Sequence, residues 1–436
     1  MLLLPLEHDP GPLAWVLDWV DDRFGPLTGL SGARLSVGRQ PHWWLYNCSL
    51  SRPVGVHFTD HPIRCSGASI DGSVALKRAL GEAIERYCWY DSQNWYEVEV
   101  LPASECSVID VLPACAGDEP CAPGLKGISP SCTLRQTRVN KLSSGERVWL
   151  PAGYVHAGLI PRNPEPHVTI PVSTGAAFSD DLVKAIWSGL CEVAERDALM
   201  LCWLNQIPAP RIAIDAHDCP LPLFERLSLL SEQGLSATFW DISTDFLVPT
   251  VLCLVRAGQY PYQAVGVACC TDPLEALCKG LDEAIMVRAA HSKAIEKVSL
   301  PSTADFGWMT ALEDHGSLYA AWQGTAAFDF LLADNQHVTD LSAFMNRAWW
   351  QRPQNMEQLR AMALRCEEEL HCTILWADIT SDEVRGRGTA VKVVVPEMVP
   401  LAVASARWLA STRLIRHAER NGRSRPGINP YPHPFP

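Results

Sequence analysis

The chain has 436 residues, a formal net charge of −13, 47% hydrophobic residues and 19% charged residues. This length is too great for one simple core, so two or three subdomains are expected. The negative charge argues against a nucleic-acid-binding protein, because phosphate binding needs a basic surface. No apolar run is long enough to span a bilayer, which argues against a membrane protein.

The N-terminal residues do not resemble a secretory signal. They lack a basic first segment and reach Glu7, His8 and Asp9 almost at once. A cytoplasmic protein is therefore expected, and its 16 cysteines are expected to be free thiols. Four of them crowd together without the close pairs typical of zinc sites, so unpaired thiols are favoured there over a metal: Cys106, Cys115, Cys121 and Cys132.

Hydrophobic periodicity and turn residues predict helices alternating with strands. Residues 102–132, rich in Pro, Gly and Cys, are expected to form a long loop, and residues 300–355 are expected to be irregular. Helices are expected at about 12–23, 73–90, 180–204, 272–293, 354–370 and 402–420. A strand and turn are expected at 147–156, and strand–turn–strand units at 237–255 and 373–396.

The two strand–turn–strand units resemble each other. WDISTD at 240–245 and WADITSD at 376–382 each follow a strand with a turn-forming Asp/Ser/Thr cluster. Two ordinary turns and an internal duplication would both explain the likeness.

A second repeat occurs in three predicted helices. LGEAIER at 80–86, LCEVAER at 190–196 and LDEAIMVR at 281–288 share a Leu-x-Glu frame. In the first two helices the glutamates lie three apart, so each pair shares one helix face. Such a pair repels by a few tenths of a kcal/mol unless a cation lies between the carboxylates. Mg²⁺ takes oxygen ligands and usually keeps a substrate phosphate in its shell, so facing helices would form a carboxylate-lined cleft.

An ordinary surface role is the alternative. Glu82–Arg86 and Glu192–Arg196 are i,i+4 pairs, and one such helix alone would favour a solvated ion pair. Apolar neighbours and the repetition favour a site instead, because glutamates among apolar residues are costly unless they are paired or bind metal.

These segments resemble the YcaO superfamily. ALGEAIERY at 79–87 and GLCEVAERDA at 189–198 are similar to its two signature helices, and the C-terminal NPYPHPFP is similar to the end of azoline-forming members, the cyclodehydratases of thiazole/oxazole-modified microcins. Further segments that resemble the family are DDRFGPLTGL at 21–30, STGAAFSDD at 173–181, GVACCTDPLEALCKGLDEAIMVR at 266–288 and VKVVVPEMVPL at 391–401.

The resemblance implies an α+β fold of the YcaO type, with several mixed or antiparallel sheets packed with helices, an internal duplication and an extended Pro-rich tail. It also implies three parts: an N-terminal subdomain over 1–60, a core over 61–425 with a loop-rich insert at 102–146, and a tail over 426–436 that enters the active site. Alternating prolines favour a stiff polyproline II strand of about 3.1 Å per residue. By resemblance, Pro432, Pro434, Pro436 and the C-terminal carboxylate support catalysis, whereas a disordered tail or a docking ligand for a proline-binding domain is the alternative.

The implied reaction is ATP-dependent cyclodehydration. A Cys, Ser or Thr side chain of a ribosomally made precursor peptide attacks the preceding backbone amide, whose oxygen is phosphorylated and leaves, giving a thiazoline or oxazoline. Magnesium would be held by Glu82, Glu85, Glu192, Glu195 and Glu283. Arg86, Arg196 and Arg288 would contact phosphate or orient the glutamates, and Arg78 and Lys184, which stand where the family usually has other residues, would be new phosphate contacts. No P-loop sequence is present.

The resemblance also implies partner proteins. A separate E1-like protein would bind the leader of the precursor peptide, a flavin-dependent dehydrogenase would oxidise azolines afterwards, and a homodimer within a larger complex is one expected assembly.

The chain departs from the family pattern at four nucleotide-site positions: Ala68, Arg78, Lys184 and Met286. These departures support one alternative, a non-catalytic YcaO-like subunit of a peptide-modifying complex. A YcaO enzyme that forms thioamides or macroamidines is a second alternative, against which the terminal proline pattern argues.

Overall fold

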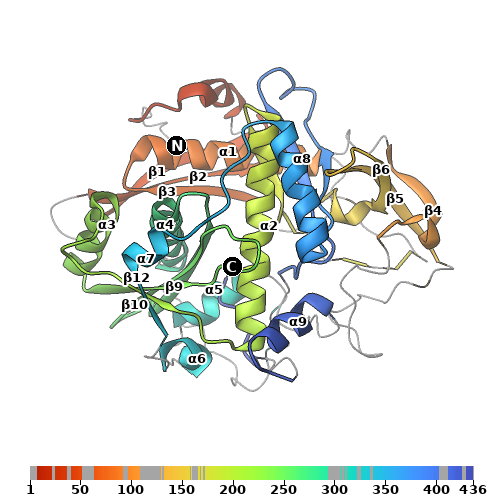
Figure 1. The fold of residues 1–436 in the computed structure, drawn as a ribbon. Helices are drawn as coiled ribbons and strands as arrows, with labels where there is room; N and C mark the ends of the chain where they lie inside the picture. The colour runs from red at the N-terminus through yellow and green to blue at the C-terminus, as the bar shows by residue number, and fades with distance from the viewer. Residues whose placement is uncertain are drawn as a thin grey trace.

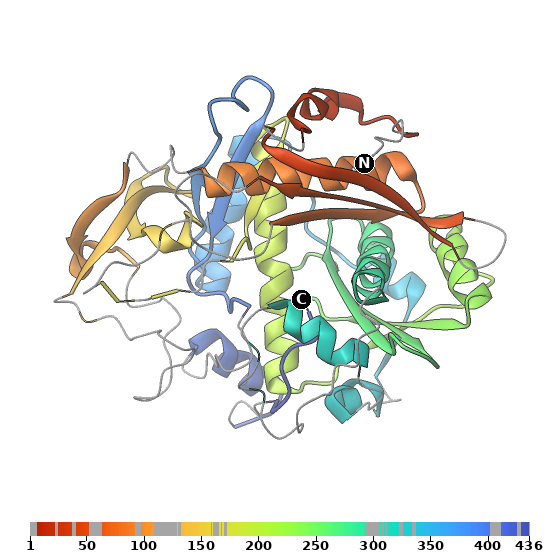
Figure 2. The same ribbon diagram turned by 180° about the vertical axis from the view of Figure 1, so that it is seen from behind.

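The computed structural model describes residues 7–21, 25–36, 41–51, 63–91, 97–108, 129, 132–157, 159, 165–166, 168–169, 172–292, 306, 309, 312–321, 326–333, 337–401, 411–424 and 429–435. Over these ranges the chain has a mixed α+β architecture in which helices pack against three β-sheets, seen from opposite sides in Figures 1 and 2.

The first sheet is antiparallel and carries the first long helix. Its strands lie in the order β1 (Leu27–Ser36), β2 (Pro41–Leu50) and β3 (Arg64–Ser69), and α1 (Gly72–Tyr90) packs against β2 and β3. A 3-10 helix, η1 (Gly11–Trp19), packs on α1.

The second sheet is built from distant segments of the chain. In spatial order it contains β4 (Glu99–Pro102), β5 (Thr133–Lys141), β13 (Leu375–Asp378), β14 (Thr389–Val394) and β7 (Ala176–Ser179), with β6 (Arg147–Pro151) paired to β5. Helix α2 (Leu182–Asn205) packs along β14 and β7.

The third sheet lies on the other side of α2 (Figure 1). Its spatial order is β11 (Gln263–Cys269), β10 (Thr250–Ala257), β9 (Leu235–Asp241), β8 (Arg211–Ala213) and β12 (Val338–Asp340). Helix α4 (Pro273–Ser292) packs on β11 and β10, and α3 (Leu221–Glu232) packs on β9 and α4.

Shorter elements complete the described part of the chain. They are η3 (Ala103–Glu105), η5 (Ala152–Tyr154), α5 (Leu312–Ala321), η6 (Ala326–Phe328), α6 (Asp329–Leu332), α7 (Leu341–Met345), α8 (Met356–Arg365), the π-helical turn η7 (Cys366–Leu370) and α9 (Thr412–Arg420).

Helix α2 is the centre of the molecule. Its side chains are buried on nearly every face from Val183 to Asn205, because the two larger sheets lie on either side of it (Figures 1 and 2). A helix that is apolar all round must be enclosed in this way. The N-terminal half packs with β14 and α8, and the C-terminal half packs with β10, β11 and α5.

The three long helices begin in the same way. Each starts directly after an aspartate whose side chain accepts a hydrogen bond from a backbone N–H of the first turn. This N-cap gives a partner to an N–H group that has none inside the helix. These aspartates, Asp71, Asp181 and Asp272, precede Glu82, Glu192 and Glu283 by the same eleven residues. The glutamates therefore lie at the same height, about three turns into each helix.

The two strand–turn–strand units are confirmed and share their hydrogen bonds. Asp241 accepts from Ser243 N at 3.0 Å, and Asp378 accepts from Thr380 N at 2.8 Å. Each hydroxyl residue then accepts from the first residues of the next strand. An internal duplication stays a prediction.

Most predicted helices are confirmed. The helix expected at 12–23 is a 3-10 helix, and of the helix expected at 402–420 only α9 lies within the described residues. Residues 133–141, placed in the loop-rich insert, form β5 inside the second sheet, because their own alternation of buried side chains outweighs the loop composition before them. Residues 312–345, expected to be irregular, contain short helices that cover the third sheet.

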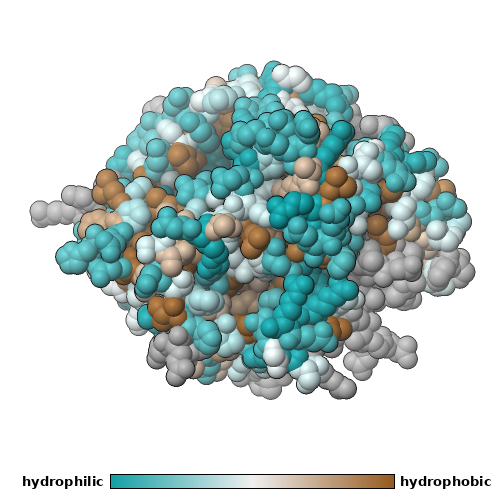
Figure 3. All heavy atoms as spheres, in the orientation of Figure 1, coloured by the Kyte–Doolittle hydropathy of each residue, from teal (hydrophilic) through white to brown (hydrophobic). Residues whose placement is uncertain are grey.

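Other expectations concern thiols and the surface. The cysteines in the described ranges are free, while Cys115 and Cys121 lie outside them. In the part of the chain that is described, no helix is both long and apolar enough to cross a bilayer. The face shown in Figure 3 is mostly hydrophilic, with apolar side chains scattered over it. The division into three domains stays a proposal; β2 pairs with β3 across the boundary expected near residue 60.

Candidate active site

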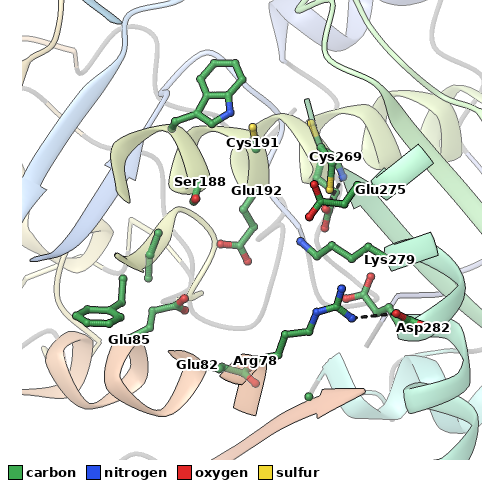
Figure 4. Close-up of a pocket in the computed structure, with 18 of the residues that line it drawn as sticks. Arg78, Glu82, Glu85, Ser188, Cys191, Glu192, Cys269, Glu275, Lys279 and Asp282 are labelled. Carbon is green, nitrogen blue, oxygen red and sulfur yellow. Dashed lines mark hydrogen bonds and ion pairs between the residues drawn. The ribbon is translucent and has the colours of Figure 1, made fainter. Parts of the chain in front are cut away.

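The three long helices meet at a cavity of about 580 Å³. Glu82 and Glu85 reach it from α1, and Glu192 reaches it from α2 on the opposite side, as Figure 4 shows. Of the glutamates and arginines predicted from the sequence, Arg288 alone does not line the cavity. Those that do are Arg78, Glu82, Glu85, Arg86, Glu192, Glu195, Arg196 and Glu283. The structure thus gathers residues that are up to about two hundred positions apart in the sequence.

Each of the aligned glutamates is held by a backbone N–H of a neighbouring segment. Glu82 accepts from Ser66 N at 2.8 Å, Glu192 from Gly175 N at 3.0 Å, and Glu283 from Val267 N at 3.0 Å. Glu195 accepts in the same way from Cys269 N at 2.8 Å. One oxygen of each carboxylate is therefore fixed by the fold, which limits its rotation toward the cavity.

The two signature arginines bridge glutamates of their own helices. Arg86 lies 3.2 Å from Glu82 and 3.8 Å from Glu85, and Arg196 lies 3.4 Å from Glu192 and 3.3 Å from Glu195. Buried Nε atoms of both arginines, and Nη1 of Arg196, have no hydrogen-bond acceptor among the described residues. Buried donors without an acceptor are rare, and such donors fit the oxygens of a phosphate.

The electrostatics of the glutamates favour a bound cation. Burial raises the pKa of Glu85 and of Glu195, and nearby glutamates raise them further against the pull of the arginines. Although burial alone would lower the pKa of Arg196, Glu195, Glu192 and Glu283 raise it. Carboxylates with raised pKa values gain the most from a cation placed among them.

The donor set fits magnesium. It consists of carboxylates, which Mg²⁺ prefers. No three ligating side chains in the described part of the chain already surround one point. Each ion would thus take one or two carboxylates and complete its shell with phosphate oxygens and water, which is typical of Mg²⁺ at nucleotide sites.

Two charged groups of the cavity, Lys279 and Asp282, were not predicted from the sequence. Lys279 of α4 points into the space between the glutamates (Figure 4), and the charges of Cys270, Glu195 and Glu283 raise its pKa. Asp282 of the same helix is 1% exposed. Lys279 lies four residues before Glu283 and therefore on the same face of the helix. This spacing could have identified Lys279 as a cavity residue from the sequence.

Asp282 holds Arg78 at the cavity. Its carboxylate accepts from Arg78 Nη1 at 3.0 Å, from Trp43 Nε1 at 2.8 Å and from both Nε (2.9 Å) and Nη2 (3.0 Å) of Arg226. Arg78 also donates to the carbonyl of Ala68 at 2.6 Å. Ala68 and Arg78, two positions expected to depart from the family pattern, are therefore joined by a hydrogen bond, which places the Arg78 guanidinium group at the cavity wall.

Met286 and Lys184, the other two positions expected to depart from the family pattern, also line the cavity. The ammonium group of Lys184 pairs with Asp180 at 3.2 Å near the surface.

The C-terminal tail runs along α2 toward the cavity. Asn429 N donates to the carbonyl of Leu204 at 3.0 Å, and Trp203 Nε1 donates to the carbonyl of Tyr431 at 2.9 Å. At the end of the described tail, the ring of Phe435 lies 3.9 Å from the Arg196 guanidinium carbon. The tail therefore reaches the arginine that bridges two cavity glutamates.

The tail is buried by contacts with α5. Tyr319 Oη donates to the carbonyl of Pro432 at 2.6 Å, and His315 Nδ1 lies 2.7 Å from the carbonyl oxygen of His433. Residues 432–435 are buried, Phe435 within the core cluster of α2 and the third sheet. Pro436 lies outside the described residues. A tail packed in this way differs from the alternative of a disordered segment or a free docking ligand.

A pH dependence of stability follows from Glu283. Burial, and then the charge of Glu195, raises the pKa of Glu283 to about 7. The folded protein thus keeps this proton to higher pH than the unfolded chain, whose glutamates titrate near 4.5, so the free energy of unfolding falls as pH rises between these values. Without metal, we expect Glu283→Gln to be more stable than wild type at pH 8 by on the order of 3 kcal/mol, and about equal near pH 4, below both pKa values.

Urea unfolding with a chelator at several pH values measures this difference. The exposed Glu369→Gln is the control and should change stability little at any pH, because its side chain is half exposed. Parallel pH profiles for wild type and Glu283→Gln would contradict the assignment.

Solved structures share this fold. A heterocyclase in complex with substrate and cofactor matches with a TM-score of 0.75 and 18% identity over 97% of this chain and 57% of that chain. YcaO from Methanopyrus kandleri bound with AMPPCP and Mg²⁺ matches with a TM-score of 0.61 and 14% identity over 90% and 91% of the two chains. The E. coli microcin synthetase McbBCD complex matches with a TM-score of 0.58 and 15% identity over 92% and 96%.

The matches extend over only part of some relatives. The chain spans 57% of the first heterocyclase and about half of a curated relative. That relative is described as an uncharacterized protein in the tfuA 3' region of Rhizobium leguminosarum bv. trifolii, and it is 26% identical over 241 residues, 51% of this chain and 54% of its own length.

The predicted YcaO-type fold is thus confirmed. A family model described as "YcaO cyclodehydratase, ATP-ad Mg2+-binding" matches residues 66–399, a range that contains all three glutamate-bearing helices and the cavity between them. The predicted use of ATP and Mg²⁺ agrees with this description, and the chain belongs to the YcaO family.

Proposed function

We propose that the protein catalyses ATP-dependent cyclodehydration of Cys, Ser or Thr residues in a ribosomally made precursor peptide, giving thiazolines or oxazolines. The observation that carries the proposal is a single cavity lined by carboxylates from three helices and by arginines that keep donors without a hydrogen-bond acceptor. The buried Pro-rich tail packs against one of these arginines, Arg196. The family's ATP and Mg²⁺ binding agrees with this set of groups.

The cavity residues divide by charge. Glu82, Glu85, Glu192, Glu195 and Glu283 would hold Mg²⁺, which when bound neutralises phosphate charge. Arg86 and Arg196 have donors without acceptors and would bind phosphate oxygens. Arg78 is fixed by Asp282 at the same wall, and Lys279 adds a second cation from α4. Arg288 does not line the cavity and has no place in this scheme.

The reaction needs these groups because an amide oxygen is a poor leaving group. The peptide's thiol or hydroxyl loses its proton to solvent as it attacks the carbonyl carbon, and the resulting oxyanion takes the γ-phosphoryl group of ATP while ADP leaves. Phosphate then departs with the former amide oxygen, the amide nitrogen loses its proton, and a C=N bond remains. Cationic donors that face developing phosphate charge are the main catalytic contribution of the protein.

The tail would complete the site. Pro432 and Pro434 are buried beside α5, and Phe435 lies against Arg196, so the described tail contacts an arginine of the cavity. We propose that Pro432, Pro434 and Pro436 support catalysis at this side of the site. A leader-binding protein would deliver the peptide, and an azoline dehydrogenase would act afterwards.

The test is a reaction of the protein with ATP, Mg²⁺, a Cys/Ser/Thr-containing precursor peptide and a leader-binding partner from the same gene neighbourhood. We expect phosphate release that requires peptide, and a mass loss of one water per modified residue, located by fragmentation. Phosphate release with a gain of sulfur in place of oxygen would indicate thioamide formation, and a lost water shared between the two ends of a ring would indicate a macroamidine.

The departures at Ala68, Arg78, Lys184 and Met286 favour a second candidate, a non-catalytic subunit. If neither phosphate release nor peptide modification occurs while the protein still binds the peptide complex, this second function replaces the first.

A further inference from the structure

The signature glutamates differ in how their N–H donors are held. Glu82 and Glu283 accept from residues inside strands, Ser66 of β3 and Val267 of β11, and the ladders of their sheets fix these donors. Glu192 instead accepts from Gly175, which lies in the turn just before β7. Its donor therefore needs support from outside the sheet.

A buried lysine supplies this support. Lys392 of β14 is 2% exposed, and its ammonium group donates to the carbonyls of Val172 and Thr174, each at 2.7 Å. The Thr174 carbonyl and the Gly175 N–H belong to one peptide group. Lys392 thus holds this planar group at its oxygen while Glu192 is bound at its nitrogen.

The turn allows little other adjustment. Gly175 has a φ of +85°, and a Cβ there would lie 2.1 Å from the carbonyl oxygen of Val393. Val393 N also donates to the carbonyl of Gly175 at 2.7 Å. Only glycine fits this left-handed position without strain, so the peptide group between Thr174 and Gly175 is clamped between β14 and α2.

The setting of Lys392 is unusual for a purely structural lysine. In the described part of the chain no carboxylate lies within ion-pair distance of its ammonium group, although Glu192, Glu85 and Arg86 face it from α2 and α1. The ring of Trp89 lies 4.9 Å from its nitrogen. A buried, unpaired lysine is costly, which favours a role in the neighbouring site.

Resting on the proposed function, we propose that Lys392 is a positioning residue for magnesium binding, which acts by fixing the peptide group that orients Glu192. It does not touch the metal or the substrate in this role. Burial lowers the pKa of Lys392 to about 7, but a neutral amine keeps two N–H groups, so both carbonyls remain bound in either protonation state.

The experiment follows Mg²⁺-dependent binding of a non-hydrolysable ATP analogue to the full-length protein. We expect Lys392→Met to raise the Mg²⁺ concentration at half-maximal binding by about tenfold or more, within the range of substitutions that orient metal ligands. Binding of the analogue without Mg²⁺ should be unchanged. Lys392→Arg, which keeps the donors, should recover much of the Mg²⁺ dependence.

Two double variants separate positioning from general damage. Lys392→Met should add nothing to the Mg²⁺ defect of Glu192→Gln, because its effect runs through Glu192. It should add in full to the defect of Glu82→Gln, whose donor lies in a different sheet. If Lys392→Met does not fold, Lys392→Gln replaces it, since the comparison asks only whether the effect needs Glu192.

The outcomes are distinguishable. An unchanged Mg²⁺ midpoint in Lys392→Met, or an effect that persists in full in Glu192→Gln, would overturn the role of Lys392 alone. An unchanged midpoint in Glu192→Gln itself would instead overturn the magnesium site of the proposed function.

Discussion

Replacing Glu192 by glutamine should lower peptide-dependent ATP hydrolysis by about 10³-fold. Loss of a ligand charge removes several kcal/mol of transition-state stabilisation that the metal supplies, and each 1.36 kcal/mol is about a factor of ten in rate. The amide oxygen of glutamine can still accept from Gly175 N, and Arg196 keeps Glu195 at 3.3 Å. The fold should therefore survive while the site loses its metal affinity.

Steady-state phosphate release at increasing Mg²⁺ measures this effect. Glu275→Gln is the matched control, because Glu275 lines the same cavity from the first turn of α4 but is not a proposed ligand. It should retain most of the activity at every Mg²⁺ concentration. A Glu192→Gln enzyme with the rate and Mg²⁺ dependence of wild type would remove this glutamate from the metal site.

The sequence predicted the parts of this site that repeat. The Leu-x-Glu frame identified Glu82, Glu192 and Glu283 because a helix converts fixed spacing into a fixed face. The equal offset of eleven positions from each capping aspartate to its glutamate gives the same alignment in the structure. Helices with strong periodicity were likewise predicted within a few residues of their observed bounds.

The groups that hold the glutamates could not be predicted from local patterns. Lys392 lies in VKVVV, which predicts only a buried strand, and its function depends on the turn at 172–175, more than two hundred residues away in the sequence. Asp282 likewise gathers Trp43, Arg78 and Arg226 from three other elements. Such contacts depend on how sheets and helices are arranged in space, and spacing along one element carries no information about them.

The composition of the preceding segment led to a wrong assignment of β5 as part of a loop. Residues 133–141 follow a segment rich in Pro, Gly and Cys and were assigned to an insert, yet β5 pairs with β4, β6 and β13. Their alternating burial is typical of a strand, but β13, the partner that joins this strand to β14 and β7, begins only at residue 375, which no local window includes.

Removing Pro434–Pro436 should abolish azoline formation. The truncation takes away Phe435, which contacts Arg196, and the chain end beyond it, but keeps the tail's hydrogen bonds to Tyr319 and His315. Because Phe435 is 4% exposed in the core, its loss should also lower the free energy of unfolding by about 2–3 kcal/mol. The tail is therefore part of the fold as well as of the proposed site.

Mass spectrometry of the peptide product and urea unfolding of the protein test the two effects separately. Pro430→Ala is the matched control, because Pro430 is exposed on the same tail and should leave both modification and stability near wild type. Phe435→Leu should recover most of the lost stability, since leucine refills the apolar space, while the contact with the Arg196 guanidinium is lost at a cost of about 0.5–2 kcal/mol. A truncated protein that is folded and still forms azolines would show that the tail serves stability alone, because the cavity glutamates and arginines would then suffice for the chemistry.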